Sequence, residues 1–367
     1  MSDTGFIPRW ASPPGDTIRD ALGELPLDPR VLAAALGLAH EELDAFLAGE
    51  IALTIRRAER LASRIGGSIE FWMTRDGQYR EDRSRVAADA WAQRLPLKDM
   101  TTFGWISANA EDWVGQIDAC LRFFDVATPE VWKADHEALL KRTRFRSSRH
   151  VLEPDEFAVA AWLRQCEVEL LKVRCRGWDR DAFAALLPQL LPLTRERDPR
   201  RFLAALQARC AEVGVAVGVI RPPRGCPVSG AARQLVNGVP SIALSGRYRA
   251  DDHLWFTFFH EAAHLLLHGL DALYVDVFEL DYVAPPSADE AEADNFAGTL
   301  LVPTEYEDRL LRARQSPLEL RSIASEIGIS LGIVIGHLQY RGALEYNTRL
   351  NRLKNRYKWN GTSLEKA

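Results

Sequence analysis

One apolar segment, Leu254 to Leu267, constrains the fold more than any other part of the chain. Large apolar side chains fill most of its positions, but His260, Glu261 and His264 interrupt them. Residues four apart lie on the same face of a helix, so both imidazoles could contact one metal ion. The alternative is a core helix whose histidines only form hydrogen bonds. Because each unpaired buried polar group costs roughly 2 kcal/mol or more, the sequence favours a metal-binding helix.

A third metal ligand is expected on the next predicted helix, residues 288–301. Catalytic zinc usually has three protein ligands and keeps one position open for water. Glu290 could be the third ligand, and Asp294, one turn later, could accept a hydrogen bond from a ligand histidine. Glu292 projects about 200° around the helix from Glu290, so both cannot bind the same ion, and Glu292 fits an acidic solvated face better. Glu290 is favoured as the third ligand because only Glu290 has an acid four residues later. Glu261, next to His260, is the expected proton acceptor.

Two nearby residues each have two interpretations. His268, one turn after His264, is either a substrate or oxyanion contact or a cation at the helix C-terminus. Cys226 lies between Gly225 and Pro227, and it is either a loop cysteine without a role or a thiolate that occupies the fourth zinc position and inhibits the enzyme. The other four cysteines lie in apolar helical stretches and are expected to be core residues.

Length and composition favour a multidomain cytoplasmic protein. A chain of 367 residues, 47% hydrophobic and 26% charged, is expected to form two or three domains. Five scattered cysteines without a C-x-x-C pair fit a reducing compartment, and no signal-peptide pattern opens the chain. No stretch reaches the roughly 18 apolar residues of a membrane span. With a net charge of −5, any nucleic-acid contact needs a local patch.

The pattern predicts an α+β, mostly helical protein in four zones: residues 1–80, 81–205, 206–310 and 311–367. The first is a bundle of short helices, the second a helical middle region, the third a compact domain, and the last a helical segment with a basic tail. In the third zone, strands on either side of Asn237-Gly238 predict a β-hairpin. Its second strand, Val239–Ser245, is expected to form the cleft edge, where an extended peptide could add as a further strand.

The first zone has the pattern of a helix-turn-helix with an acidic second helix. Gly37 separates two short helices that share one apolar stripe, made of Leu32, Leu36, Leu43, Phe46 and Leu47. Residues 39–50, at the position of the recognition helix, contain four acids and no Lys or Arg. Carboxylates there would be repelled by phosphates. We therefore expect dimerisation or partner docking rather than duplex binding.

The last zone ends in a basic stretch. Residues 341–358 contain six Lys or Arg and one acid, and the aromatic residues Tyr346, Tyr357 and Trp359 lie among or next to them. Basic groups that follow phosphates and rings that stack on bases suit single-stranded DNA. The alternative is a solvated helix end that packs its aromatic rings on the preceding domain.

Several stretches resemble the ImmA/IrrE metallopeptidases, namely Asp252–His260, His260–His264 and Glu290–Pro303. Residues 14–80 are similar to the HigA-like Xre helix-turn-helix that is often fused in front of such peptidases, and Ile323–Leu338 also looks like that longer architecture. The resemblance implies a gluzincin-like zinc peptidase domain, with a small sheet on two helices, and a helix-turn-helix-like C-terminal segment. It also implies a cytoplasmic protease that cuts a partner transcriptional repressor after DNA damage or phage-related stress.

Together these observations predict an endopeptidase with one zinc ion per chain, held by His260, His264 and Glu290, with Glu261 as the proton carrier. The expected substrate is a helix-turn-helix repressor encoded nearby. Single-stranded DNA is the candidate trigger, a homodimer is a further expectation, and no membrane partner is expected. The alternative is a DNA-binding or antitoxin-like regulator whose peptidase domain is only a sensor. The complete ligand set and the acidic recognition segment favour the peptidase.

Overall fold

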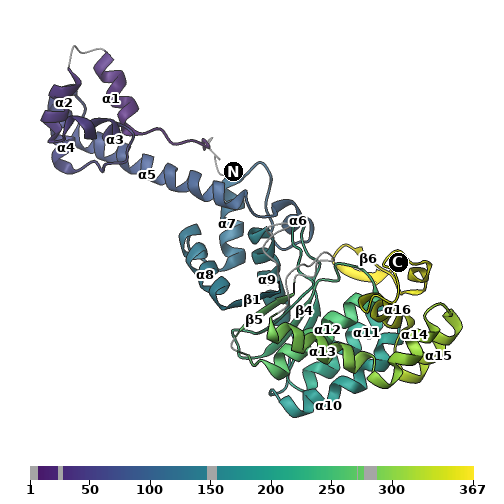
Figure 1. Cartoon of the computed structure of the whole chain (residues 1–367). Helices are drawn as coiled ribbons and strands as arrows, with labels where there is room; N and C mark the ends of the chain where they lie inside the picture. Colours follow the sequence, from purple (N-terminus) through teal and green to yellow (C-terminus); the bar gives the residue numbers. More distant parts are fainter. Residues whose placement is uncertain (1–6, 24–27, 147–154, 271, 277–286) are drawn as a thin grey trace. The chain divides into compact units, whose positions relative to one another are not determined.

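The computed structural model describes residues 7–23, 28–146, 155–270, 272–276 and 287–367 (Figure 1). The chain forms two compact units, Met1–Arg94 with Ala108–Cys120, and Leu95–Ser107 with Leu121–Ala367. These units differ from the four predicted zones. The predicted boundary at residue 80 falls inside one helix and that at residue 310 inside another.

The first unit is a helical bundle. Its elements are α1 (Pro14–Gly23), α2 (Pro29–Leu36), the 3-10 helix η1 (His40–Glu42), α3 (Leu43–Leu47), α4 (Ile55–Ile65) and α5 (Ile69–Ala92). Helix α7 (Trp113–Phe124) begins in this unit. The predicted stripe from Leu32 to Leu47 is buried in its core, and Gly37 ends α2 in the left-handed conformation, with φ 66°. The acids Glu41, Glu42 and Asp44 are exposed.

The second unit combines helices with two sheets. Its helices are α6 (Leu97–Thr102), α8 (Pro129–Arg142), α9 (Glu156–Leu170), α10 (Arg180–Leu190), α11 (Pro199–Glu212), α12 (Asp251–Leu267), α13 (Ala288–Leu301), α14 (Glu307–Ala313), α15 (Pro317–Ile327) and α16 (Leu331–Tyr340). Its strands are β1 (Thr143–Arg146), β2 (Ala216–Val219), β3 (Gly230–Gln234), β4 (Pro240–Leu244), β5 (Leu273–Asp276), β6 (Tyr357–Asn360) and β7 (Ser363–Lys366). Short 3-10 helices are η2 (Leu191–Arg195), η3 (Thr304–Tyr306) and η4 (Arg349–Leu353).

The main sheet is mixed, with strand order β1-β5-β3-β4-β2. Strands β3 and β4 form the predicted hairpin, with Gly238 at φ 82° in its turn. Strand β4 also pairs in parallel with β2, so it lies inside the sheet and all five of its residues are buried. The expectation that this strand forms an open cleft edge is therefore wrong. The remaining strands, β6 and β7, form a separate antiparallel pair.

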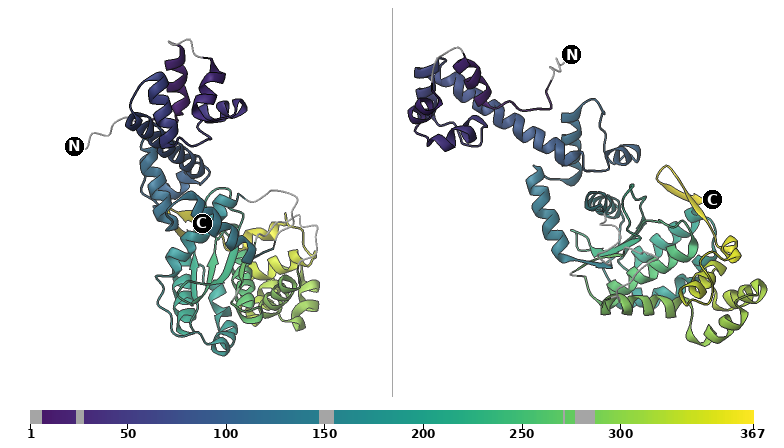
Figure 2. Two further views of the ribbon diagram at one scale, coloured as in Figure 1. Left: turned by 90° about the vertical axis from the view of Figure 1, so that its left-hand side faces the viewer. Right: turned by 45° about the horizontal axis from the view of Figure 1, so that its top comes forward.

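Helices cover both faces of this sheet, as Figures 1 and 2 show. Side chains of alternate strand residues, such as Ala231 and Ala243, pack with α9 in one apolar cluster. Their neighbours Ala232 and Ile242 point to the other face, against α11 and α12. Helices α13 to α16 join this second cluster, so the predicted C-terminal segment shares one core with the predicted peptidase domain.

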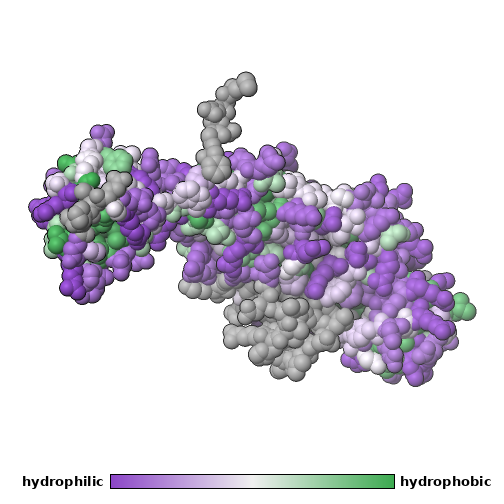
Figure 3. Space-filling model, turned by 90° about the horizontal axis from the view of Figure 1, so that it is seen from above, coloured by the Kyte–Doolittle hydropathy of each residue, from purple (hydrophilic) through white to green (hydrophobic). Residues whose placement is uncertain are grey.

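The architecture agrees with a mostly helical α+β fold. The predicted helix at 288–301 has those bounds, and the apolar segment Leu254–Leu267 lies within one helix, Asp251–Leu267. None of the helices in the described ranges combines the length and hydropathy needed to cross a membrane. On the face shown in Figure 3, hydrophobic residues form small patches among hydrophilic ones.

Candidate metal centre

Helix α12 carries two of the three residues that converge on one point. It is buried along nearly its whole length, and His260, Glu261 and His264 are at most 1% exposed. The helix ends at Leu267, His268 caps it, and Gly269 then adopts φ 83°, a backbone conformation that suits glycine. Because apolar residues lie on every side of α12, the helix packs in the core. Its buried polar side chains are shielded from water and therefore need partners within the protein.

Helix α13 supplies the third residue and lies beside α12 in Figures 1 and 2. Ser287 caps it, and its hydroxyl accepts a hydrogen bond from the Glu290 backbone N–H at 3.3 Å. Glu290 is thereby fixed in the first turn of the helix, where a carboxylate is favoured by the helix dipole. Its side chain is buried against α12.

The three side chains have the spacing of a zinc site. The Nε2 atoms of His260 and His264 lie 3.1 Å apart, and the Glu290 carboxylate lies 3.1 Å from the first and 3.5 Å from the second. Ligand atoms at about 2.0–2.1 Å from a tetrahedral ion would be about 3.3 Å apart. Two histidines and one glutamate are also a donor set that catalytic zinc uses. These residues therefore fit a zinc ion.

Each ligand histidine is oriented through its other ring nitrogen. Asp294 Oδ1 lies 3.0 Å from His260 Nδ1, which is the contact that the spacing of Glu290 and Asp294 suggested. His264 Nδ1 lies 2.9 Å from His268 Nδ1. Such contacts keep the Nδ1 proton in place and leave the Nε2 lone pair for a metal ion.

The electrostatic environment favours positive charge at this point. Burial lowers the pKa of His260, but hydrogen bonds to Asp294 and Glu290 and the charges of Asp276 and Glu261 outweigh it and raise that pKa to about 10. Burial raises the pKa of Glu290, yet its contacts with both histidines bring it down to about 2. A cation held between these groups is thus stabilised by the surrounding carboxylates.

Glu261 follows His260 on α12 and faces the first residue of β3. A Cβ atom at Gly230 would lie 2.7 Å from Glu261 Oε1 and 2.5 Å from Thr257 Cγ2, so only glycine leaves room there. The strand backbone therefore lies directly against the carboxylate. This close approach fixes Glu261 beside the ligand cluster without making it part of the cluster.

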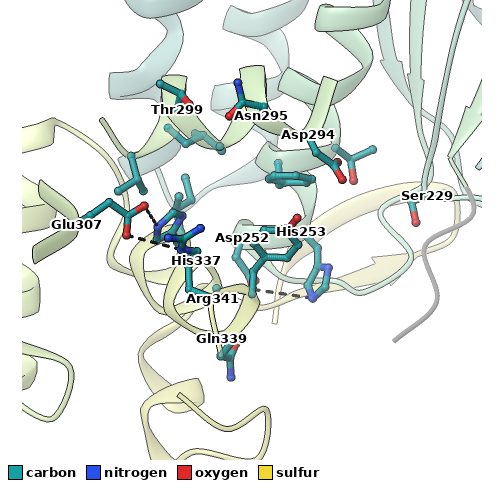
Figure 4. A pocket seen from close by; sticks show the side chains of 18 of the residues that line it. Ser229, Asp252, His253, Asp294, Asn295, Thr299, Glu307, His337, Gln339 and Arg341 are labelled. Carbon is teal, nitrogen blue, oxygen red and sulfur yellow. Dashed lines mark hydrogen bonds and ion pairs between the residues drawn. The ribbon is translucent and has the colours of Figure 1, made fainter. Parts of the chain in front are cut away.

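A cavity of about 410 Å³ begins close to Glu261 and extends between α12, α13 and α16 (Figure 4). Thr257, one turn before Glu261, and Ser229, which precedes Gly230, line one end. Asp294 also lines the cavity, and its carboxylate contacts His260. The volume is that of a small-ligand or side-chain pocket. The cavity therefore adjoins the cluster of His260, His264 and Glu290, although none of these three residues lines the cavity wall.

Cys226 lies elsewhere than expected. It is 7% exposed and packs with residues of α9, on the sheet face opposite α12. Burial raises the pKa of its thiol to about 12, so no thiolate forms at neutral pH. The described metal-ligating group contains His260, His264 and Glu290 but not Cys226. The interpretation of Cys226 as an inhibitory zinc ligand is therefore wrong.

Replacing Cys226 with Ser should leave zinc affinity unchanged and lower the free energy of unfolding by about 1–3 kcal/mol, because a hydroxyl is placed in an apolar cluster. Cys226→Ala is the control that adds no polar group. Competition with a chromophoric chelator and urea unfolding would measure both quantities. A clear change in zinc affinity for folded Cys226→Ser alone would contradict this placement.

The basic C-terminal stretch is less accessible to a nucleic acid than its composition suggested. Lys354 is buried, and its ammonium lies 2.5 Å from Asp252 Oδ2 and 2.6 Å from Gln339 Oε1. Tyr357 is 3% exposed in the core of the second unit. These two residues cannot follow phosphates or stack on bases, which corrects that part of the interpretation.

Sequence reasoning missed three residues at the cluster. Tyr274 of β5 stacks on the His264 ring, with centroids 4.1 Å apart and an interplanar angle of 11°. Asp276, at the end of the same strand, is buried and raises the pKa of His260. Glu292 is exposed, as a solvated face requires, but it also lies 3.1 Å from His268 Nε2. Only Glu292 had a detectable signal, as the acid between Glu290 and Asp294.

A family comparison covers this part of the chain. Residues 227–338 match the sequence model of the peptidase M78 family, described as an IrrE N-terminal-like domain. The match extends from the loop before β3 to α16 and contains all three cluster residues. It supports an ImmA/IrrE peptidase domain in this region and suggests a metallopeptidase role. No curated protein and no solved structure matches the chain.

Proposed function

We propose that this chain is a zinc-dependent, site-specific endopeptidase. The observation that carries the proposal is the convergence of His260, His264 and Glu290 at distances of 3.1–3.5 Å, with Glu261 next to them. The IrrE-like match over residues 227–338 supports the same class of activity.

The three cluster residues would hold the ion, which would supply Lewis acidity and lower the pKa of a nearby water towards about 7. Glu261 would accept the proton of the attacking water and deliver it to the leaving amine. Asp294 would keep the Nδ1 proton on His260, since its carboxylate lies 3.0 Å from that nitrogen. The cavity that begins at Ser229 and Thr257 would receive substrate side chains.

The proposed substrate is a helix-turn-helix transcriptional repressor encoded beside this chain, cleaved in the cytoplasm after DNA damage or phage-related stress. The exposed acids of the first unit disfavour duplex binding and leave dimerisation or partner docking as its proposed role. Single-stranded DNA as the trigger is a separate proposal, now limited to the exposed basic residues of the C-terminal stretch, such as Arg352 and Lys358.

The test combines metal analysis with a cleavage assay. Purified protein is expected to contain one zinc per chain, measured by elemental analysis, and to cut a neighbouring repressor at one bond, measured by mass spectrometry. Treatment with a chelator should abolish cleavage, and added zinc should restore it. Protein that binds zinc but leaves every neighbouring repressor intact while binding duplex DNA would instead favour the regulator interpretation.

A further inference from the structure

His268 is the one histidine near the cluster whose role the proposed mechanism leaves open. Its Nδ1 lies 2.9 Å from His264 Nδ1, and its Nε2 lies 3.1 Å from Glu292 Oε2. Its side chain is only 7% exposed. Both ring nitrogens therefore have protein partners at hydrogen-bond distance, and neither is left for a substrate carbonyl or an oxyanion.

We propose that His268 and Glu292 form a hydrogen-bonded relay that positions His264 for metal binding. This proposal rests on the zinc site proposed above, but not on peptidase activity. His268 is then a positioning residue rather than a substrate or oxyanion contact, and Glu292, on the exposed face of α13, is its acceptor.

The hydrogen-bond geometry specifies where each proton lies. The Nε2 atom of His264 faces His260 and Glu290, so a metal ion would take its lone pair and the proton must be on Nδ1. That N–H can donate only to an acceptor, so His268 Nδ1 carries a lone pair. The remaining proton is on His268 Nε2, which donates to the Glu292 carboxylate. One tautomer of each histidine therefore satisfies all contacts at once.

The fold holds the relay in place from two sides. His268 is the C-terminal cap of α12, directly after Leu267, and its backbone N–H donates to the His264 carbonyl at 3.1 Å. Tyr274 stacks on the His264 ring from β5. With the ring face and Nδ1 both fixed, rotation of His264 away from the cluster is restricted. His260 has the simpler arrangement, with Asp294 as its direct acceptor.

Zinc affinity provides a test that does not depend on cleavage. In competition with a chromophoric chelator, His268→Ala should bind zinc about 10-fold to 100-fold more weakly, the usual cost of losing such an orienting contact. His268→Asn should recover most of the affinity, because Asn Oδ1 can stand where His Nδ1 accepts. Glu292→Ala should weaken binding less than His268→Ala does, and Glu292→Gln, which keeps an acceptor oxygen, should weaken it least. Glu305→Ala, at an exposed acid of η3, is the control.

Cobalt substitution supplies a spectroscopic readout that a purely structural role would not change. The ligand-field absorption of the cobalt-loaded protein should change in His268→Ala and return towards the wild type in His268→Asn. Unchanged zinc affinity and spectrum in a folded His268→Ala protein would overturn the relay, and so would equal losses in the Ala and Asn variants. If His268→Ala does not fold, the comparison of Glu292→Ala with Glu292→Gln decides, because Glu292 is 62% exposed and tolerates substitution.

The outcomes separate this proposal from the proposed function. A wild-type chain that binds no zinc would overturn both. A chain that binds zinc, shows the expected order of affinities and cuts no protein would overturn only the peptidase. Loss of cleavage in His268→Ala at wild-type zinc affinity would overturn the relay and restore His268 as a substrate contact.

Discussion

Glu261→Gln protein should cut the proposed repressor substrate about 10²-fold to 10⁴-fold more slowly than the wild type while it still contains one zinc per chain. Gln has nearly the shape of Glu, and the carboxylate lies outside the ligand cluster, so the metal and the fold should be retained. The lost step is proton transfer from water to the leaving amine. Single-turnover cleavage, zinc content and thermal unfolding measured on the same preparation would test this expectation.

Two results would decide against it. If Glu261→Gln cleaved at the wild-type rate, another group would be the proton carrier. If it lost zinc, the residue would belong to the metal site itself. Glu305→Gln, at an exposed acid of η3, is the matched control and should leave cleavage and zinc content unchanged.

Local patterns were sufficient to predict the helices that carry the site. The apolar run from Leu254 to Leu267 specified a buried helix, and the spacing within it indicated which residues share a face. The acids at 290, 292 and 294 specified two faces of the next helix, and the structure brings Glu290 to His260 and His264. Helical periodicity works here because neighbours along one helix face are close in sequence.

Contacts between distant segments were not predictable in the same way. Strand β5 is only four residues long and pairs with β3 and β1, which lie far from it in sequence, so Tyr274 and Asp276 gave no local sign of their place at the cluster. The position of β4 inside the sheet also depends on a non-local pair, with β2. The hairpin motif predicts that β4 pairs with β3, but it does not predict which strand pairs with the other side of β4.

The cysteine loop shows how a correct local feature can lead to a wrong site. Gly225 and Pro227 do flank Cys226 in a loop, and such residues often mark exposed turns. This loop is instead tied down, because Arg247 donates to the Pro227 carbonyl at 2.6 Å and the Arg224 N–H donates to Asp99 at 2.6 Å. The apolar partners of Cys226 come from α9, more than fifty residues earlier in the chain.

Lys354→Met should lower the free energy of unfolding by about 3–5 kcal/mol, the largest stability effect that we expect. The ammonium lies between Asp252 and Gln339, and all three side chains are at most 8% exposed. Removing it leaves the Asp252 carboxylate buried in the first turn of α12 without its counter-ion. Charge composition alone suggested that Lys354 is solvated, because Asp252 is 102 residues away in the sequence.

Urea unfolding followed by tryptophan fluorescence, on zinc-loaded protein, would measure this loss. Lys358→Met is the matched control, since Lys358 is exposed and its replacement should change stability by less than about 0.5 kcal/mol. The double variant Asp252→Asn with Lys354→Met should be more stable than Lys354→Met alone, because it removes the stranded charge. Equal stability of Lys354→Met and Lys358→Met would show that the buried pair does not hold the C-terminal segment against the N-terminus of α12. The contribution of that segment to the core of the second unit would then depend on its apolar residues.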